Sequence, residues 1–175
     1  MNKNFIEGER VSLRGIEEED ASFIKENINK SDIRLFVDHR GPTTSRKEED
    51  FIREVNNDDS RFSFIIMYEG ERVGFIELKT LLTESRLGEI EIWVDPEYQG
   101  EGIGKKSSEM IVDFGFNHLN FHKIIAKLHS SNKSSESIWQ ELDFDREGRM
   151  KKALILDGEW VDALTYGMLR EDWVE

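Results

Sequence analysis

A strand pattern, a glycine-rich turn and a helix pattern follow one another in the segment Glu89-Ile90-Glu91-Ile92-Trp93-Val94-Asp95-Pro96-Glu97-Tyr98-Gln99-Gly100-Glu101-Gly102-Ile103-Gly104-Lys105. Residues 89–94 alternate as in a strand, Asp95-Pro96 ends the run, and a helical pattern extends over 103–119. The glycines let backbone N–H groups approach phosphate oxygens, and the N-terminus of the following helix favours their negative charge. The segment therefore predicts a phosphate-binding loop, although a plain tight turn would explain the glycines equally well.

Two commoner phosphate-binding loops do not fit this spacing. A dinucleotide-binding fingerprint needs a third glycine three residues after Gly102, where Lys105 stands. A Walker loop needs glycine at position 99, and Ser or Thr directly after Gly104-Lys105. Both are excluded, so the rest of the chain must identify the phosphate compound.

The composition is that of a globular protein. The chain has 175 residues, 37% of them hydrophobic, and these values predict one domain over residues 1–175 with an ordinary core. The absence of Cys excludes disulfides, a thiol nucleophile and a cysteine metal site. No apolar run approaches transmembrane length and no signal-like start is present, so we expect a cytoplasmic protein.

The chain is strongly acidic. Its 37 Asp and Glu against 24 Lys and Arg give a formal net charge of −13. This charge disfavours nonspecific binding to nucleic acid or anionic membranes, so neither is expected as a partner, and it would attract a cationic amine. Acidity also keeps a protein in solution, so the charge does not identify the substrate.

The flanking sequence predicts strands and helices in quick succession. A helix over 20–29 has the acidic run Glu17–Asp20 at its start, interpreted as a solvated cap, and Ser45 with Glu48 forms a capping box for a second helix. Asp157-Gly158 is typical of a hairpin turn. The remaining expected elements are strands over 11–14, 62–68, 72–78, 89–94 and 123–128, a loop over 31–44, and a helix over 132–142.

A second motif supports the phosphate-binding interpretation. Asn132-x-x-Ser135 is followed by Trp139, Leu142 and Phe144. Together with Gln-x-x-Gly-x-Gly at 99–104, this spacing resembles the two coenzyme A motifs of the GCN5-related N-acetyltransferases. The resemblance covers roughly residues 8–173 and is closest to the branch that contains ribosomal-protein and spermidine acetyltransferases.

The resemblance implies an α+β fold, a three-layer arrangement with a mixed, mostly antiparallel sheet of about seven strands and about four helices on its two faces. It implies an acetyl-CoA-dependent N-acetyltransferase that needs no metal. The backbone of Ile92, Trp93 and Val94 would pair with the pantetheine arm as if it were another strand. Asn132 and Ser135 would meet the pantetheine and nucleotide end, and the pyrophosphate would be surrounded by Gln99, Gly100, Gly102, Ile103, Gly104 and Lys105.

The reaction requires a base, because an alkyl ammonium with a pKa near ~10.4 must lose a proton before its nitrogen can attack. Glu89 and Glu91 lie two residues apart on the expected strand and therefore share one face with Trp93, predicted to be polar. Similar enzymes use glutamates on this strand as bases, so Glu89 and Glu91 are the candidate catalytic residues, with Glu89 ahead. A plain solvent-facing alternation is the other interpretation.

Two positions depart from the family pattern. Trp139 stands where many relatives have a tyrosine that protonates the leaving thiolate, and an indole N–H cannot act as a useful acid. The proton for the leaving thiolate would then come from water, from another side chain such as Tyr166, or from no dedicated group. Asp143 replaces the glycine that usually precedes Phe144. The missing tyrosine leaves open a non-catalytic coenzyme A-binding sensor as the alternative function.

The sequence does not identify the acceptor. The resemblance implies a primary amine, which could be a protein N-terminus, a polyamine or another small amine. The loop over 31–44, with Asp32, Asp38 and His39, is the candidate for acceptor specificity. A homodimer is left open.

Overall fold

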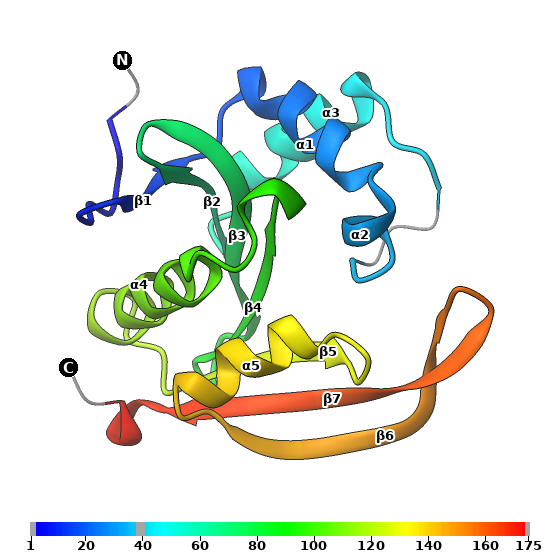
Figure 1. Cartoon of the computed structure of the whole chain (residues 1–175). Coiled ribbons are helices and arrows are strands. Elements are labelled where there is room, and N and C mark those ends of the chain that lie inside the picture. The colour runs from blue at the N-terminus through cyan, green and yellow to red at the C-terminus, as the bar shows by residue number, and fades with distance from the viewer. Residues whose placement is uncertain (1–2, 38–40, 174–175) are drawn as a thin grey trace. The chain divides into compact units, whose positions relative to one another are not determined.

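The computed structural model describes residues 3–37 and 41–173. Its strands form one seven-stranded sheet in the order β1-β2-β3-β4-β5-β7-β6 (Figure 1). β4 and β5 are parallel, whereas β1 with β2, β5 with β7 and β6 with β7 are antiparallel, so the expected mixed sheet is confirmed. The strands are β1 (Val11–Gly15), β2 (Arg61–Tyr68), β3 (Glu71–Leu82), β4 (Leu87–Val94), β5 (Lys123–His129), β6 (Asp145–Leu156) and β7 (Glu159–Leu169).

Five α-helices accompany the sheet in the described ranges, where the sequence predicted about four. They are α1 (Ala21–Ile28), α2 (Ser31–Arg34), α3 (Ser45–Asn56), α4 (Ile103–Asn117) and α5 (Lys133–Glu141). The additional helix, α2, is a single turn in the segment expected to be a loop, and Ile33 anchors it by packing into the core. Asp38 and His39 of that segment lie outside the described residues.

The chain folds as two compact units, the first made of residues 1–77 and 92–107. In this unit α1 and α3 lie side by side (Figure 1). Their apolar faces pack with β-strand residues in one core, because helix residues three or four apart share a face. The buried core residues are Ile16, Ala21, Ile24, Ile28, Ile33, Ile52, Val55, Ile65, Phe75 and Trp93.

The second unit comprises residues 78–91 and 108–175. It contains β5 and the long β6–β7 hairpin, with α5 against β5 (Figure 1). Gly115 of α4 allows close packing, since an added Cβ would come within 2.8 Å of side-chain carbons of Leu78 and Ile124. Large apolar side chains such as Phe116 and Trp139 are fully buried here.

Turns and caps mostly follow the sequence patterns. Asp157 and Gly158 have φ values of 49° and 84°, the positive values that a two-residue hairpin turn requires. The helix cap before α3 was predicted wrongly: Thr44, not Ser45, is the N-cap and accepts a hydrogen bond from the Lys47 N–H. Glu48 instead bonds the hydroxyl of Thr43.

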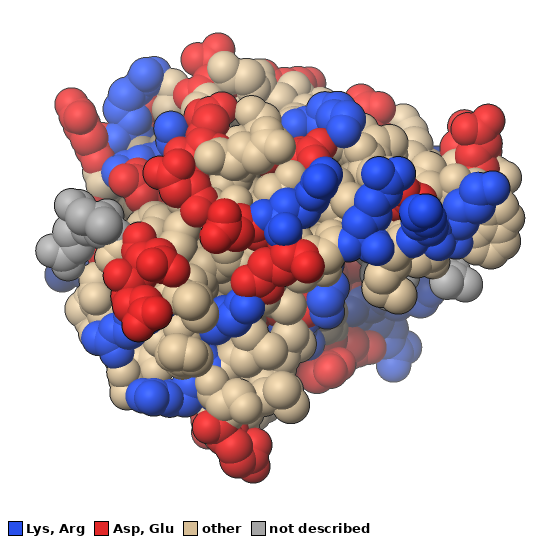
Figure 2. All heavy atoms as spheres, turned by 90° about the horizontal axis from the view of Figure 1, so that it is seen from below, with Lys and Arg blue, Asp and Glu red and all other residues tan. Residues whose placement is uncertain are grey.

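Both signs of charge are interspersed over the face of the molecule in Figure 2. Basic side chains gather toward the end of that face where Figure 1 has the β6–β7 hairpin. Arg149, Lys151 and Lys152 of β6 are exposed. None of the helices in the described ranges is long and apolar enough to cross a membrane.

Candidate active site

β4 carries the segment expected to contact the cofactor. Its paired register with β5 covers Leu87–Ile90, and the strand continues beyond this ladder to Val94. Ile92, Trp93 and Val94 therefore lie beyond the paired residues of the β4–β5 ladder. A pantetheine arm that pairs with the backbone of these residues would need such a position. The Trp93 side chain was expected on a polar face, which is wrong: it is buried in the core, 5.7 Å from the Phe23 ring centroid and 6.1 Å from that of Phe75.

The glycine loop has the backbone geometry that only glycine adopts readily. Gly100 and Gly102 have φ values of 86° and 76°. A Cβ added at either glycine would meet no protein atom within 4 Å, so their backbone conformation, rather than crowding, requires glycine. The Gln99 side-chain amide donates to the Val94 carbonyl at 2.9 Å and ties the start of the loop to the end of β4.

Helix α4 begins directly after the loop. The Gly102 carbonyl accepts a hydrogen bond from the Lys106 N–H at 3.0 Å, which makes Gly102 the residue before the first helical turn. The N–H groups of Ile103, Gly104 and Lys105 belong to this first turn, where an α-helix has no internal acceptors for them. Ile103 is buried and fixes the turn, whereas Lys105 is exposed. The segment can therefore present several donors and a cation to an anionic group.

An ion pair fixes the residue between β4 and the loop. Lys30 Nζ lies 2.9 Å from both carboxylate oxygens of Asp95, which is buried. Asp95 also accepts from the Glu97 N–H at 3.2 Å and caps the short 3-10 helix Pro96–Tyr98. The Lys30–Asp95 ion pair joins the residue before α2 to the residue that follows β4, across 65 positions of sequence.

Glu89 and Glu91, the candidate bases, differ in burial. The Glu89 side chain is 9% exposed, and its carboxylate lies 3.0 Å from Lys127 Nζ and 4.0 Å from Lys79 Nζ. The Glu91 side chain is 55% exposed and is paired with Lys79. Two lysine ammonium groups thus form ion pairs with the two carboxylates. Of these carboxylates, that of Glu89 is largely buried and that of Glu91 is exposed.

The start of α5 is organised by side-chain hydrogen bonds. The Asn132 side-chain oxygen accepts from the Ser135 N–H at 3.2 Å and caps the helix. The Trp139 indole N–H donates to the Ser135 hydroxyl oxygen at 3.3 Å. Because this bond uses an acceptor position of the hydroxyl, the Ser135 O–H remains a donor for another group.

Tyr166, the alternative acid, is hydrogen-bonded to a carboxylate on α5. Its hydroxyl donates to Glu136 at 2.9 Å, and Lys133 Nζ lies 2.7 Å from the other Glu136 oxygen. Burial, with the Glu136 bond second, raises the pKa of Tyr166 above its ordinary value. The Lys133 bond and then the Tyr166 bond lower the pKa of Glu136. A buried phenol with a raised pKa is a weaker proton donor than an ordinary tyrosine, so this geometry does not favour Tyr166 as the acid.

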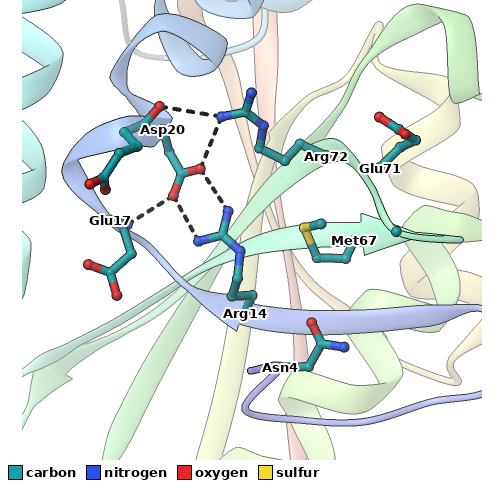
Figure 3. A pocket seen from close by; sticks show the side chains of 9 residues that line it. Asn4, Arg14, Glu17, Asp20, Met67, Glu71 and Arg72 are labelled. Carbon is teal, nitrogen blue, oxygen red and sulfur yellow. Dashed lines mark hydrogen bonds and ion pairs between the residues drawn. The ribbon is translucent and has the colours of Figure 1, made fainter. Parts of the chain in front are cut away.

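A pocket of about 530 Å³ in the first unit contains none of the predicted site residues. Asp20 lies between the guanidinium groups of Arg14 and Arg72 (Figure 3), with an Arg14 contact of 2.7 Å. The same carboxylate accepts from the Glu17 N–H at 2.9 Å. The acidic run at this helix start is therefore not simply a solvated cap, because Asp20 is buried and joins β1 to α1.

Comparison with known proteins places the chain in a family. A model described as an acetyltransferase (GNAT) domain matches residues 10–145. The chain belongs to this family. The family, the α+β fold and the enzyme class expected from the sequence, an N-acetyltransferase with acetyl-CoA as co-substrate, are thereby confirmed.

Individual GNAT relatives are distant in sequence. The spermidine N(1)-acetyltransferase of Escherichia coli (strain K12) is 25% identical over 154 residues, covering 88% of this chain and 83% of that enzyme. The spermidine N-acetyltransferase of Vibrio cholerae, solved with CoA and spermine, has a TM-score of 0.88 at 22% identity, covering 95% and 99%. RimL, a ribosomal L7/L12 acetyltransferase solved with CoA, has a TM-score of 0.87 at 18% identity, covering 95% and 98%. At these identities the two structures show the fold alone.

Sequence reasoning missed three features of this GNAT chain. The Lys30–Asp95 pair and the lysines beside Glu89 join residues too far apart in sequence for spacing to reveal. The third feature is Gly74 of β3, which belongs to no sequence motif. A Cβ at this position would come within 2.5 Å of the Trp93 carbonyl oxygen and 3.2 Å of the Val94 Cα. An isolated glycine in a strand is itself a signal of close backbone approach.

Proposed function

We propose that this GNAT enzyme transfers the acetyl group of acetyl-CoA to a primary amine by direct attack, with Glu89 as the base. The observation that carries this proposal is the contact of Glu89, a nearly buried carboxylate, with the primary ammonium of Lys127 at 3.0 Å. An acceptor ammonium has the same chemistry as this lysine group. Glu89 can therefore hold such a cation and accept its proton.

The assignment of cofactor contacts follows the donors available in each segment. The backbone of Ile92, Trp93 and Val94 pairs with the pantetheine arm, and a backbone N–H near Val94 meets the oxyanion. Asn132 and Ser135 contact the pantetheine and nucleotide end. The loop and first α4 turn bind the pyrophosphate through Gln99, Gly100, Gly102, Ile103, Gly104 and Lys105; the positive φ values of its two glycines support this assignment.

Glu91 takes the secondary role. Its exposed carboxylate is paired with Lys79, so an acceptor amine would compete there with water as well as with the lysine. The protons of Trp139 and Tyr166 are both engaged with Ser135 and Glu136, respectively. We therefore assign the protonation of the leaving thiolate to water.

The acceptor class favoured here is a polyamine or another small polycationic amine, because the Escherichia coli relative is a spermidine N(1)-acetyltransferase; the net charge of −13 is compatible with such an acceptor but does not by itself identify it. A peptide N-terminus is the competing acceptor. Incubation with acetyl-CoA and a panel of polyamines, small monoamines and peptides, followed by release of free thiol, distinguishes them. No thiol release with any acceptor, together with tight acetyl-CoA binding, would instead identify a coenzyme A sensor.

Variants of the glutamates test the base. Glu89→Gln should lower kcat by about 100-fold, whereas Glu91→Gln should have a smaller effect. Glu159→Gln, an exposed glutamate on β7, is the control for the loss of one negative charge. Equal rates for Glu89→Gln and the control would overturn the assignment of the base.

Variants of the loop test the cofactor site. Gly102→Ala should raise the KM for acetyl-CoA, because alanine resists a φ of 76°. Gly70→Ala is the matched control: Gly70 has a φ of 91° and open space around it, but lies in the β2–β3 turn. A similar KM for both variants would contradict the pyrophosphate assignment.

We also propose that residues 1–175 act as one acetyltransferase domain in the cytoplasm. The match over residues 10–145, which includes parts of both compact units, supports the single domain. Whether the enzyme works alone or as a homodimer is measured by light scattering.

A further inference from the structure

Lys127 is the nearer of the two lysines that lie beside the proposed base. Its Nζ lies 3.0 Å from Glu89 Oε2, while its side chain is 54% exposed. The carboxylate is fixed and nearly buried, whereas the lysine stem keeps contact with solvent and has four rotatable bonds. The ammonium can therefore leave the carboxylate without disturbing the core.

Lys127 lies just beyond the parallel ladder between β4 and β5. The last paired residues of the parallel ladder are Ile90 and Ala126, and Lys127 follows Ala126 directly. On β4, the residues after Ile90 are Glu91 and the segment 92–94 assigned to the pantetheine arm. Lys127 thus stands at the end of the ladder, beside the base.

We propose that Lys127 is a self-acetylation site of this enzyme, an inference that rests on the proposed function. Glu89 accepts a proton from the Lys127 ammonium, and the freed Nζ lone pair attacks the thioester carbonyl carbon of acetyl-CoA. The C–N bond forms, the nitrogen loses its second proton to water, the C–S bond breaks, and the coenzyme A thiolate takes a proton back from water. Glu89 then releases the first proton to solvent, so one proton is released overall. The products are Nζ-acetyllysine and coenzyme A, with no change of oxidation state.

The modification changes the surroundings of the base. Acetylation removes the positive charge of Lys127 and with it the ion pair to Glu89. Lys79, whose Nζ is 4.0 Å from Glu89 and which also pairs with Glu91, is then the nearest cation described for this carboxylate. Glu89 would be available to an incoming acceptor ammonium.

The test is incubation of the intact protein with acetyl-CoA and no acceptor, followed by mass spectrometry of the protein and its peptides. We expect the gain of one acetyl group, located on Lys127, at a rate that saturates with acetyl-CoA and falls when coenzyme A is added. The first-order rate constant of labelling should not depend on protein concentration, because the donor and acceptor sites belong to one chain. Glu89→Gln should slow the labelling by about 100-fold.

Lys133 is the matched control for chemical acetylation by acetyl-CoA itself. It also forms a lysine–glutamate pair, at 2.7 Å from Glu136, and its side chain is 75% exposed. Labelling of Lys133 as fast as Lys127, or labelling of Lys79 in place of Lys127, would overturn the proposal. Lys127→Arg keeps a cation beside Glu89 but has no acetylatable amine, so it should abolish the mass gain.

The two proposals fail in distinguishable ways. Thiol release with external amines but an unmodified Lys127 would refute self-acetylation and leave the proposed function standing. No thiol release with any amine, and no labelling of Lys127, would refute both.

Discussion

Asp143 adopts a backbone conformation that costs a non-glycine residue free energy. Its φ is 59°, in the left-handed region, at the position directly after Leu142, the C-cap residue of α5. Glycine reaches this conformation without strain, so Asp143→Gly should stabilise the protein by about 0.5–1 kcal/mol, less the entropy that glycine adds to the unfolded chain. Urea denaturation measures the change.

Asp145 is the control for this substitution. It is the first residue of β6, where an extended backbone gives glycine no advantage. Asp145→Gly should therefore destabilise the protein or leave it unchanged. Equal stabilisation by both substitutions would show that the left-handed conformation of Asp143 is not the cause.

The Trp139 indole orients the Ser135 hydroxyl, and a double-mutant cycle measures whether acetyl-CoA binding uses this bond. Trp139→Phe keeps an aromatic ring but removes the N–H donor. We expect a rise of about threefold to tenfold in the KM for acetyl-CoA with little change in kcat, corresponding to one hydrogen bond. In a Ser135→Ala background the same substitution should have no further effect on KM. Additive effects would indicate that Trp139 only fills space.

Spacing predicted which residues meet on one strand, but not what surrounds each of them. Alternation on β4 identified Glu89 and Glu91 as a pair, whereas their different burial depends on lysines 38 and 12 positions away. The interpretation of Trp93 as part of a polar face was wrong for the same reason, since Phe23 and Phe75 come from other elements. Local periodicity carries no information on such partners.

At the scale of elements, Gly74 allows β3 to approach the end of β4 that we propose to bind the cofactor. A Cβ at this position would lie 2.5 Å from the Trp93 carbonyl oxygen, a backbone atom that cannot turn aside as a flexible side chain does. Gly74→Ala should cost about 1–3 kcal/mol of unfolding free energy, as overpacking does, and should raise the KM for acetyl-CoA by displacing Trp93 and Val94. Thermal denaturation and steady-state kinetics measure the two effects.

Gly15 of β1 provides the comparison. A Cβ added there would meet nothing within 4 Å, so Gly15→Ala should change stability by less than about 0.5 kcal/mol and leave the KM unaltered. Identical behaviour of the two variants would mean that β4 can yield to the added methyl group.

Helix α5 is anchored by a carboxylate whose protonation should weaken it. The pKa of Glu136 is lowered from its ordinary value of 4.5 by Lys133 and Tyr166. The ionised Glu136 therefore stabilises the protein fully at pH values above the pKa that Glu136 has in the unfolded chain. This stabilisation is lost as the pH falls through the lower pKa that Glu136 has in the folded protein. The stability difference between the native protein and Glu136→Gln should be largest near neutral pH and shrink below about pH 4.5. Urea denaturation at several pH values measures it, and a difference that grows at low pH would contradict this assignment.

Element types were easier to predict than their ends. Strong patterns such as Asn132 before α5 and Asp157-Gly158 between β6 and β7 predicted the elements correctly, because cap and turn chemistry is local. The turn α2 was missed because Ile33 is held by tertiary packing. The irregular β6–β7 register could not be predicted either, since it depends on contacts between the strands.

At the scale of the whole molecule, the net charge of −13 should affect how a polycationic acceptor binds. Salt screens attraction between separated charges, so the KM for a polyamine should rise by about threefold or more between about 20 mM and about 200 mM NaCl. The KM for a small monoamine should change less. Thiol-release kinetics at constant pH measure both, and a salt-independent polyamine KM would show that the overall charge plays no part.

The fold and the donor were accessible from sequence because the coenzyme A motifs are local. Gln99–Gly104 and Asn132–Ser135 each lie within one turn or helix start, where a few residues determine backbone geometry. The acceptor was not accessible, because its binding depends on side chains brought together by the fold. Lys127 beside Glu89 is an example: neither residue belongs to a motif with the other.

The β6–β7 hairpin has an irregular register that affects how readily the edge of the sheet can aggregate. Between the pairs Met150–Ala163 and Leu154–Val161, three residues of β6 face one residue of β7, and Asp162 holds this bulge by accepting from the Lys152 N–H at 2.7 Å. β6 is the last strand of the sheet, so its outer edge is where another chain could add a strand and begin an aggregate. A bulge with charged Lys151 and Lys152 interrupts that template, and the hairpin can remain long without becoming a seed for fibrils.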